Sequence, residues 1–167
     1  RYYAALNQYA LGEADENEIF QLEMIMKQAK VSTDDRKVTV AAKEKASKEN
    51  AISAAIELQD GTIITSKTSD FLGTSAALLL NATKYMAGID HNVKLIPSDM
   101  IEPIQKTKLE ILHGKNPRLH TDEVLVALSM LSRSDDNCKK ALEKLPELRG
   151  CQVHSTVMLS EVDRKIF

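Results

Sequence analysis

Three groups of polar residues have types and spacings that suit anion binding or proton transfer. The first is Lys67, Thr68 and Ser69, which stand where a strand-like run gives way to a helical pattern. A lysine beside the exposed amides of a helix N-terminus can hold a phosphate or a carboxylate. An ordinary capped helix beside a solvated lysine explains the same residues, and the sequence favours this simpler interpretation.

The segment around Lys67 also comes close to a nucleotide-binding motif. Residues 61–68, GTIITSKT, nearly match the P-loop pattern G-x-x-x-x-G-K-[ST]. A P-loop needs glycine before the lysine, where this chain has Ser66, and a flexible loop that curls around phosphates. The intervening Thr-Ile-Ile-Thr is instead typical of a strand, so we do not expect a P-loop.

The second group lies in the loop 113–119, where Lys115 and Arg118 precede a helix that is capped at His120 or Thr121. Arginine offers a bidentate fork to an anion, and helix amides add further donors. His120 would then act as an acid or a base. Two cations in a polar loop are also commonplace on protein surfaces, so both interpretations stay open.

The third group is His154 and Ser155, in a strand predicted over 152–159, where the two side chains face opposite sides. His154 could be a general base or an anion ligand, although a lone histidine in a strand is more often a structural residue. Spacing alone assigns no Ser–His–acid triad, because Asp122 and Glu123 equally suit the first turn of a helix.

Bulk properties exclude several classes of partner. The 167 residues carry a net charge of −2, which gives no electrostatic reason to expect nucleic acid or an anionic membrane surface. The chain has no Trp and no apolar run near the ~20 residues of a membrane span. Cys138 and Cys151 lack metal-ligand spacing, and we expect two unpaired thiols in a reducing cytoplasm rather than a disulfide.

The central elements read as a hairpin, a helix and a return strand. Asp60-Gly61 joins two β-branched runs within 52–65, which predicts a tight hairpin. Residues 71–86 show helical periodicity, and 93–96 forms a short strand that Pro97 ends. A strand, a crossover helix and a second strand favour a right-handed parallel pair.

The rest of the chain reads as helical. We expect an α/β fold in which a helical arm over residues 1–48 precedes an α/β subdomain over 49–167, with a mixed sheet of about four strands under covering helices. Expected helices outside the central unit cover 2–11, 16–30, about 33–48, 100–112, 121–131, 135–145 and 161–167. The chain starts without Met and ends on a helical pattern, so we expect it to be part of a longer protein.

The order of these elements is similar to that of the cytidine-deaminase-like fold. Those deaminases carry H-x-E after the hairpin and P-C-x-x-C later, which together hold zinc. This chain has Lys67-Thr68-Ser69 at the first position and contains no C-x-x-C. We therefore expect the topology without the zinc motif, and no metal site.

Several long stretches together closely resemble one bacterial family, catalogued as domain of unknown function 1846, in its C-terminal portion. They are RYYAALNQYA, DDRKVTVAAKEKA, LQDGTIITSKTSDFLGTSAALLLNA, EPIQKTKLEILHGKNPRLHTDEVLVALS and LRGCQVHSTVMLSEVD. The resemblance implies a cytoplasmic protein of several subdomains, whose preceding portion holds a glycine-rich stretch similar to a phosphate-binding loop. The family commonly has Gly at the position of Ser66, and this chain departs there.

The resemblance supplies no activity, but it ranks the candidates. Lys67, Arg118, His120 and His154 all lie in matching stretches, and we expect Lys67 and the 113–120 loop to converge at one edge of the sheet. One hypothesis is a site for a phosphorylated small molecule or nucleotide, with His120 and His154 as candidate acids or bases. The other is a structural module that holds the remainder of a longer chain, or a second copy, and binds no ligand.

Overall fold

The computed structural model describes residues 1–166. The chain forms two compact units, Arg1–Arg36 and Lys37–Phe167. We call them the N-terminal unit and the α/β unit. The boundary lies earlier than the expected end of the helical arm at residue 48, because the helix over Lys37–Glu49 packs on the sheet of the α/β unit.

The N-terminal unit is a pair of helices, α1 (Tyr2–Ala10) and α2 (Glu16–Ala29), followed by a 3-10 turn over Thr33–Asp35. The Tyr2 hydroxyl donates to Glu23 across the pair at 2.8 Å. No residue of α2 is buried. This unit therefore has contacts between its helices but little core of its own.

The α/β unit is built on a three-stranded antiparallel sheet of β1 (Ser53–Glu57), β2 (Ile63–Lys67) and β3 (Gln152–Ser155), in the order β2-β1-β3. The predicted hairpin at Asp60-Gly61 is confirmed. Gly61 has a φ of +83°, which an L side chain rarely adopts, and the Asp60 carboxylate accepts from the amide of Thr62 at 2.9 Å.

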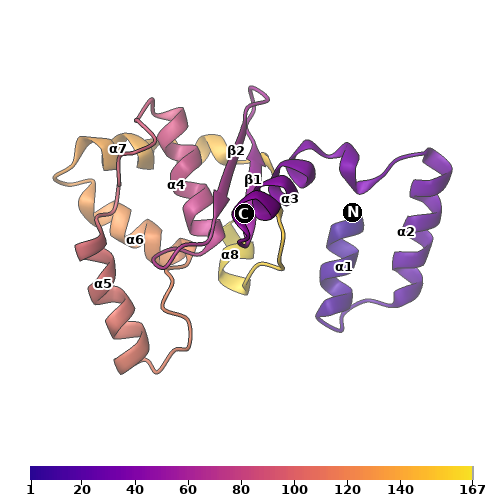
Figure 1. Ribbon diagram of the computed structural model, residues 1–167, viewed down its shortest axis with the longest axis horizontal. Coiled ribbons are helices and arrows are strands. Elements are labelled where there is room, and N and C mark those ends of the chain that lie inside the picture. Colours follow the sequence, from indigo (N-terminus) through magenta and orange to yellow (C-terminus); the bar gives the residue numbers. More distant parts are fainter. Residues whose placement is uncertain (167) are drawn as a thin grey trace. The chain divides into compact units, whose positions relative to one another are not determined.

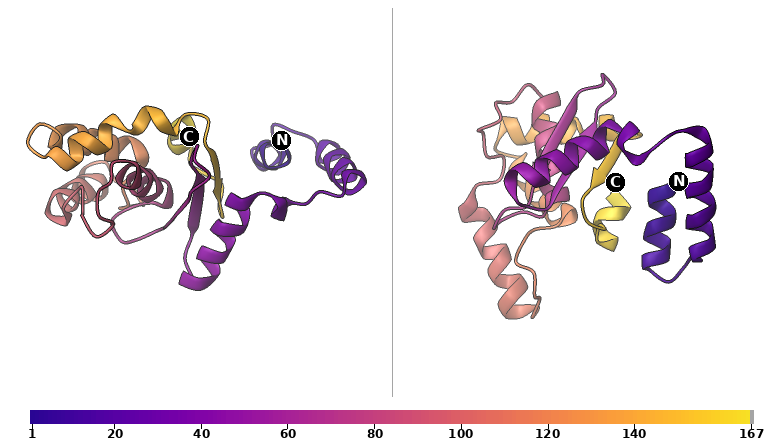
Figure 2. Two further views of the ribbon diagram at one scale, coloured as in Figure 1. Left: turned by 90° about the horizontal axis from the view of Figure 1, so that it is seen from above. Right: turned by 45° about the vertical axis from the view of Figure 1, so that its right-hand side comes forward.

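Helices cover both faces of this sheet. On one face α3 (Lys37–Glu49) packs Val38 and Ala42 against Ala55, while α4 (Thr74–Met86) covers the other face. Figure 1 and the left view of Figure 2 show the strands between these two helices. Because strand side chains alternate, neighbouring strand residues point into different layers.

Further helices lie on the α4 side and complete the main core. These elements are α5 (Ser98–Lys106), a π-helical turn (Thr107–Ile111), α6 (Thr121–Leu131), α7 (Asp136–Glu143), a 3-10 turn (Leu145–Leu148) and α8 (Glu161–Ile166). Leu79, Leu119 and Leu128 are fully or almost fully buried in the cluster that joins α4 to α6 and α7. Burial of each such side chain stabilises the fold by roughly 1.5–3 kcal/mol.

The α/β class with covering helices is confirmed, but the parallel strand pair is wrong. Residues 93–96 form no strand. The Lys84 ammonium instead binds the start of this segment, donating to the carbonyls of His91 at 2.7 Å and Val93 at 3.2 Å. Leu95 and Ile96 are buried as an irregular segment against the main core. The similarity to the cytidine-deaminase-like topology stays a prediction.

The helix predicted from residue 71 begins later. Residues 69–72 form a turn in which the Ser69 hydroxyl accepts from the amides of Phe71 and Leu72, at 3.3 and 3.1 Å. The first helical residue is Thr74, and Gly73 is the N-cap. The turn and the helix start bring this segment against the loop that precedes α6.

Within residues 1–166, no helix combines the length and apolarity that crossing a membrane requires. Cys138 and Cys151 are free thiols, as expected. Burial raises the pKa of the Cys138 thiol to about 11, so this thiol stays protonated at neutral pH.

Candidate functional site

The loop 113–120 is pinned to the body of the α/β unit, and it forms the densest polar cluster among the candidates. Leu119 is fully buried and makes a parallel bridge with Leu72. Its carbonyl accepts from the amide of Gly73 at 3.1 Å, and its own amide donates to the carbonyl of Phe71 at 2.9 Å. The loop is therefore a fixed edge against the start of α4.

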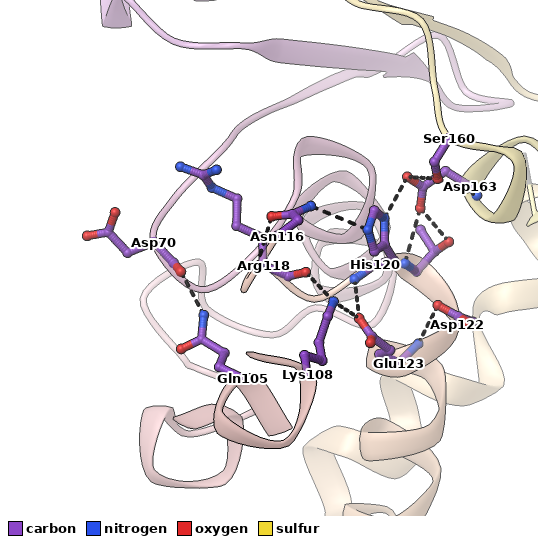
Figure 3. Close-up of polar contacts among 11 residues, drawn as sticks. Asp70, Gln105, Lys108, Asn116, Arg118, His120, Asp122, Glu123, Ser160 and Asp163 are labelled. Carbon is purple, nitrogen blue, oxygen red and sulfur yellow. Dashed lines mark hydrogen bonds and ion pairs between the residues drawn. The ribbon is translucent and has the colours of Figure 1, made fainter. Parts of the chain in front are cut away.

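His120 is held at both ring nitrogens. Its Nδ1 lies 3.3 Å from Asp163 Oδ2, and its Nε2 lies 3.4 Å from the Asn116 side-chain amide (Figure 3). A carboxylate at Nδ1 and an amide donor at Nε2 favour the tautomer with the proton on Nδ1. The His120 side chain is 31% exposed, so part of the ring is accessible to a ligand.

Asp163 anchors this histidine from α8. One carboxylate oxygen accepts from the amide and hydroxyl of Thr121, at 3.2 and 2.8 Å, and the other accepts from the Ser160 hydroxyl at 2.9 Å. Burial acts to raise the pKa of Asp163, but the hydrogen bonds from Thr121, Ser160 and His120 together hold that pKa below its ordinary value. Asp163 is therefore a fixed negative charge behind the imidazole.

A second pair supports the same loop from α5's π-helical extension. The Lys108 ammonium donates to Glu123 and to the carbonyl of Arg118, both at 2.7 Å. The same Glu123 oxygen accepts from the amide of His120 at 2.8 Å. Figure 3 shows the two carboxylates of Glu123 and Asp163 flanking the start of α6.

These carboxylates change the expected role of the helix N-terminus. The amides of His120 and Thr121 already donate to Glu123 and Asp163. The prediction that amides at the start of α6 would bind a ligand anion is therefore wrong for these two donors. Glu123 and Asp163 occupy the position that the helix dipole offers to an anion.

Arg118 remains available for an anion. Its Nε donates to the carbonyl of Ser69 at 2.6 Å, which fixes the guanidinium against the 69–72 turn. No carboxylate of the described residues pairs with Arg118, and Figure 3 shows its terminal nitrogens extending away from the cluster. Lys115 lies exposed in the same loop.

The first predicted group is not an anion site of the kind expected. Lys67 forms an ion pair with Glu49 of α3 at 2.5 Å. The amides of Thr68 and Ser69 donate to the carbonyls of Ile52 and Leu72. These two amides are therefore not free to bind a phosphate beside Lys67.

Strand register places the side chains of Lys67 and His154 on the α3 face of the sheet. Ser66 is buried toward α4, so the next residue, Lys67, points toward α3. His154 pairs with Ala55, which packs on α3, whereas Ser155 pairs with Ala54 on the α4 face. The Lys67 side chain thus turns to Glu49, while Arg118 of the 113–120 loop reaches the carbonyl of Ser69, two residues further along the chain. Convergence of Lys67 and this loop on one ligand stays a prediction.

Sequence reasoning missed Lys108 and Asp163. Asp163 follows Ser160 by three residues, and its amide donates to the Ser160 hydroxyl, so an S-x-x-D cap was the available signal. Its contact with His120 spans 43 residues of sequence, and no local pattern shows such a pairing. Among residues 1–166 we find no cluster of three or more His, Cys, Asp or Glu side chains able to hold a metal ion.

This geometry defines an α/β domain with an antiparallel sheet. Its polar cluster lies where the 113–120 loop meets α4, α6 and α8. Residues 34–167 match the family model described as domain of unknown function DUF1846, C-terminal, and the chain belongs to that family. The similarity extends over all 167 residues to bacterial relatives that carry the name UPF0371 protein.

Two relatives illustrate the sequence identity to this family and the part of each relative that the chain covers. The UPF0371 protein of Corynebacterium aurimucosum is 46% identical over the whole chain, which covers 34% of the relative. The one from Streptococcus uberis is 40% identical over 166 residues, again 34% of the relative. The chain thus spans about a third of the length of the curated relatives it matches. The relatives' names assign no activity.

Proposed function

We propose that the α/β unit contributes a binding site for a phosphorylated small molecule or nucleotide in a cytoplasmic protein. Arg118 is the anion-binding residue, with Lys115 beside it, and His120 is the acid or base. The observation that carries the proposal is the guanidinium of Arg118, held by one hydrogen bond to Ser69 and paired with no described carboxylate. Arginine in such a fixed position matches phosphate geometry well.

The neighbouring His120 supports a role in proton transfer as well as binding. A buried carboxylate at Nδ1 fixes the orientation and tautomer of an imidazole, which is one role of the acid in a catalytic triad. Ser160 donates to Asp163 and not to His120, so this serine is not placed as a nucleophile. The arrangement suits acid–base chemistry on a bound ligand rather than covalent catalysis.

The test is a thermal-shift series on the intact protein with inorganic phosphate, AMP and glucose 6-phosphate. A ligand present at about 100 times its Kd adds about 2.7 kcal/mol, which raises the unfolding midpoint by several degrees in a domain of this size. We expect Arg118→Ala to abolish that shift, while Arg133→Ala, an exposed arginine outside the cluster, retains it. Retention of the shift in Arg118→Ala, or no shift with any of the three probes, would sink the proposal.

A second candidate function is a structural module, and a specific observation favours it. Large apolar side chains are exposed on several helices, for example Phe20 at 62%, Ile111 at 69% and Met130 at 66%. In relatives three times as long as this chain, such faces would pack against the remainder of the protein or a second copy. Light scattering tests this function: a monomer at all concentrations, with no binding to the separately expressed remainder of a relative, contradicts it.

A further inference from the structure

A cavity lies beside the 69–72 turn, and Ser69, Phe71 and Leu72 form part of its lining. It has a volume of about 300 Å³, at the lower end of the range for small-molecule sites. Its walls come from α4, the irregular segment 91–96 and the start of α5. The apolar part of the lining includes Phe71, Leu72, Ala77, Leu80, Leu95 and Ile101.

One ionisable side chain in this wall is deeply buried. Lys84 of α4 lines the cavity and is only 8% exposed. Its ammonium donates to the carbonyls of His91 at 2.7 Å and Val93 at 3.2 Å. An ammonium group has three donors, so these two carbonyls leave one N–H for another partner.

Lys84 has no direct ion-pair partner within the described residues. No described carboxylate forms an ion pair with it, and the other cationic or titratable side chains in the wall are His91 and Lys94. Burial lowers the pKa of Lys84, and the negative charge of Asp90 opposes this lowering without reversing it. Buried charges are normally paired, because desolvation of a lone ion costs several kcal/mol.

A purely structural role explains only part of this arrangement. Lys84 does tie the 91–96 segment to α4, but a neutral donor would bind two carbonyls without burying a charge. An anion in the cavity would use the remaining N–H and neutralise the ammonium. The apolar wall would meanwhile cover a hydrocarbon body.

We propose that this cavity binds a small organic carboxylate, with the carboxylate paired to Lys84 and the apolar body against Leu80, Leu95 and Ile101. A carboxylate is favoured over a phosphate ester, because Lys84 offers a single point charge with one remaining donor. Arg118 does not line this cavity. The proposal is therefore independent of the phosphate site, and either can fail alone.

The experiment measures binding of benzoate to the intact protein by calorimetry, with benzamide and phenyl phosphate as matched probes. We expect benzoate to bind at least tenfold more tightly than either probe. Lys84→Met should weaken benzoate binding at least tenfold. Lys106→Met, which replaces a lysine that is 70% exposed on α5, should leave it unchanged.

Ala77→Leu keeps Lys84 intact and fills the cavity from a half-buried position in its wall. This variant should also abolish benzoate binding, so the proposal stays testable if Lys84→Met fails to fold. Equal binding of benzoate and benzamide, tighter binding of phenyl phosphate, or full binding by the folded Ala77→Leu variant would each overturn the proposal.

Discussion

At the scale of single residues, Asp163 holds the polar cluster together through its hydrogen bonds. It accepts hydrogen bonds from Thr121 and Ser160 and lies against His120 Nδ1. These partners come from α6 and α8, which are far apart in sequence. A carboxylate with this many donors is both an anchor for α8 and the counter-charge of the imidazole.

Asp163→Asn should therefore destabilise the α/β unit by about 1–3 kcal/mol at neutral pH, since an amide cannot accept all of these hydrogen bonds. Chemical denaturation measures this change. Ser134→Ala is the control: this exposed serine donates to the carbonyl of Leu131 in a loop outside the cluster, and we expect little effect. Equal stability of Asp163→Asn and the wild type would contradict the anchoring role.

The pH dependence of the same variant has a defined sign. The pKa of Asp163 is lowered in the folded state, so its contribution to stability is complete above the ordinary aspartate pKa and is lost as pH falls through the folded value. The difference in unfolding free energy between wild type and Asp163→Asn should shrink as pH falls below about 4. A difference that stays constant down to pH 2 would contradict this assignment.

Lys67 forms a surface ion pair with Glu49. Hydrogen bonds from Lys67 and Lys45 lower the pKa of Glu49 to about 2. Lys67→Met should raise that pKa toward the ordinary glutamate value while leaving ligand binding at Arg118 unchanged. Carbon-detected NMR titration of the Glu49 carboxyl measures the change, and an unaltered Glu49 pKa would contradict the pairing.

At the scale of elements, Leu119 anchors the 113–120 loop in the core. Leu119 is fully buried, whereas Leu112, seven positions earlier, is 70% exposed. Leu119→Ala should destabilise the α/β unit by about 2–5 kcal/mol, the range for leucine truncation in a packed core. The matched control Leu112→Ala should change stability by less than about 0.5 kcal/mol. Similar effects of the two truncations would show that the loop is not anchored.

The elements also show which parts of the fold could be predicted from sequence. The Asp60-Gly61 hairpin and the apolar periodicity of α4 are local signals, and both predictions are confirmed. The strand predicted over 93–96 is wrong: Leu95 and Ile96 are buried in an irregular segment, and Lys84 of α4 binds the carbonyls of His91 and Val93 where this segment begins. A lysine on the buried face of an apolar helix was the available hint of that contact.

The candidate site also has features that local sequence shows and features that only the folded chain reveals. Loop composition pointed to Arg118 and His120, and in the structure the Arg118 amide and the His120 ring both contact the side chain of Asn116. Their role as a site stays a prediction. The separation of Lys67 and His154 onto the α3 face depends on strand register, which the single sequence did not determine. The Asp163 and Lys108 contacts are long-range, so only the folded structure reveals them.

At the scale of the whole molecule, the two compact units predict independent folding of the larger one. The α/β unit has its own core, and the family match begins at residue 34, close to its start. A fragment of residues 37–167 should therefore show the same cooperative unfolding midpoint as the complete chain, within about 3 °C by calorimetry. Loss of cooperative unfolding in this fragment would show that the N-terminal unit completes the core.

The central claim is that Arg118 and His120 form an anion-binding site, and an NMR titration with AMP tests it most directly. We predict saturable shifts of backbone amides over 116–120 and at Ser69, with no shift at Lys67 or His154, and loss of these shifts in Arg118→Ala. Saturating AMP that perturbs only amides outside 116–120 and Ser69, or perturbs none, would contradict the claim.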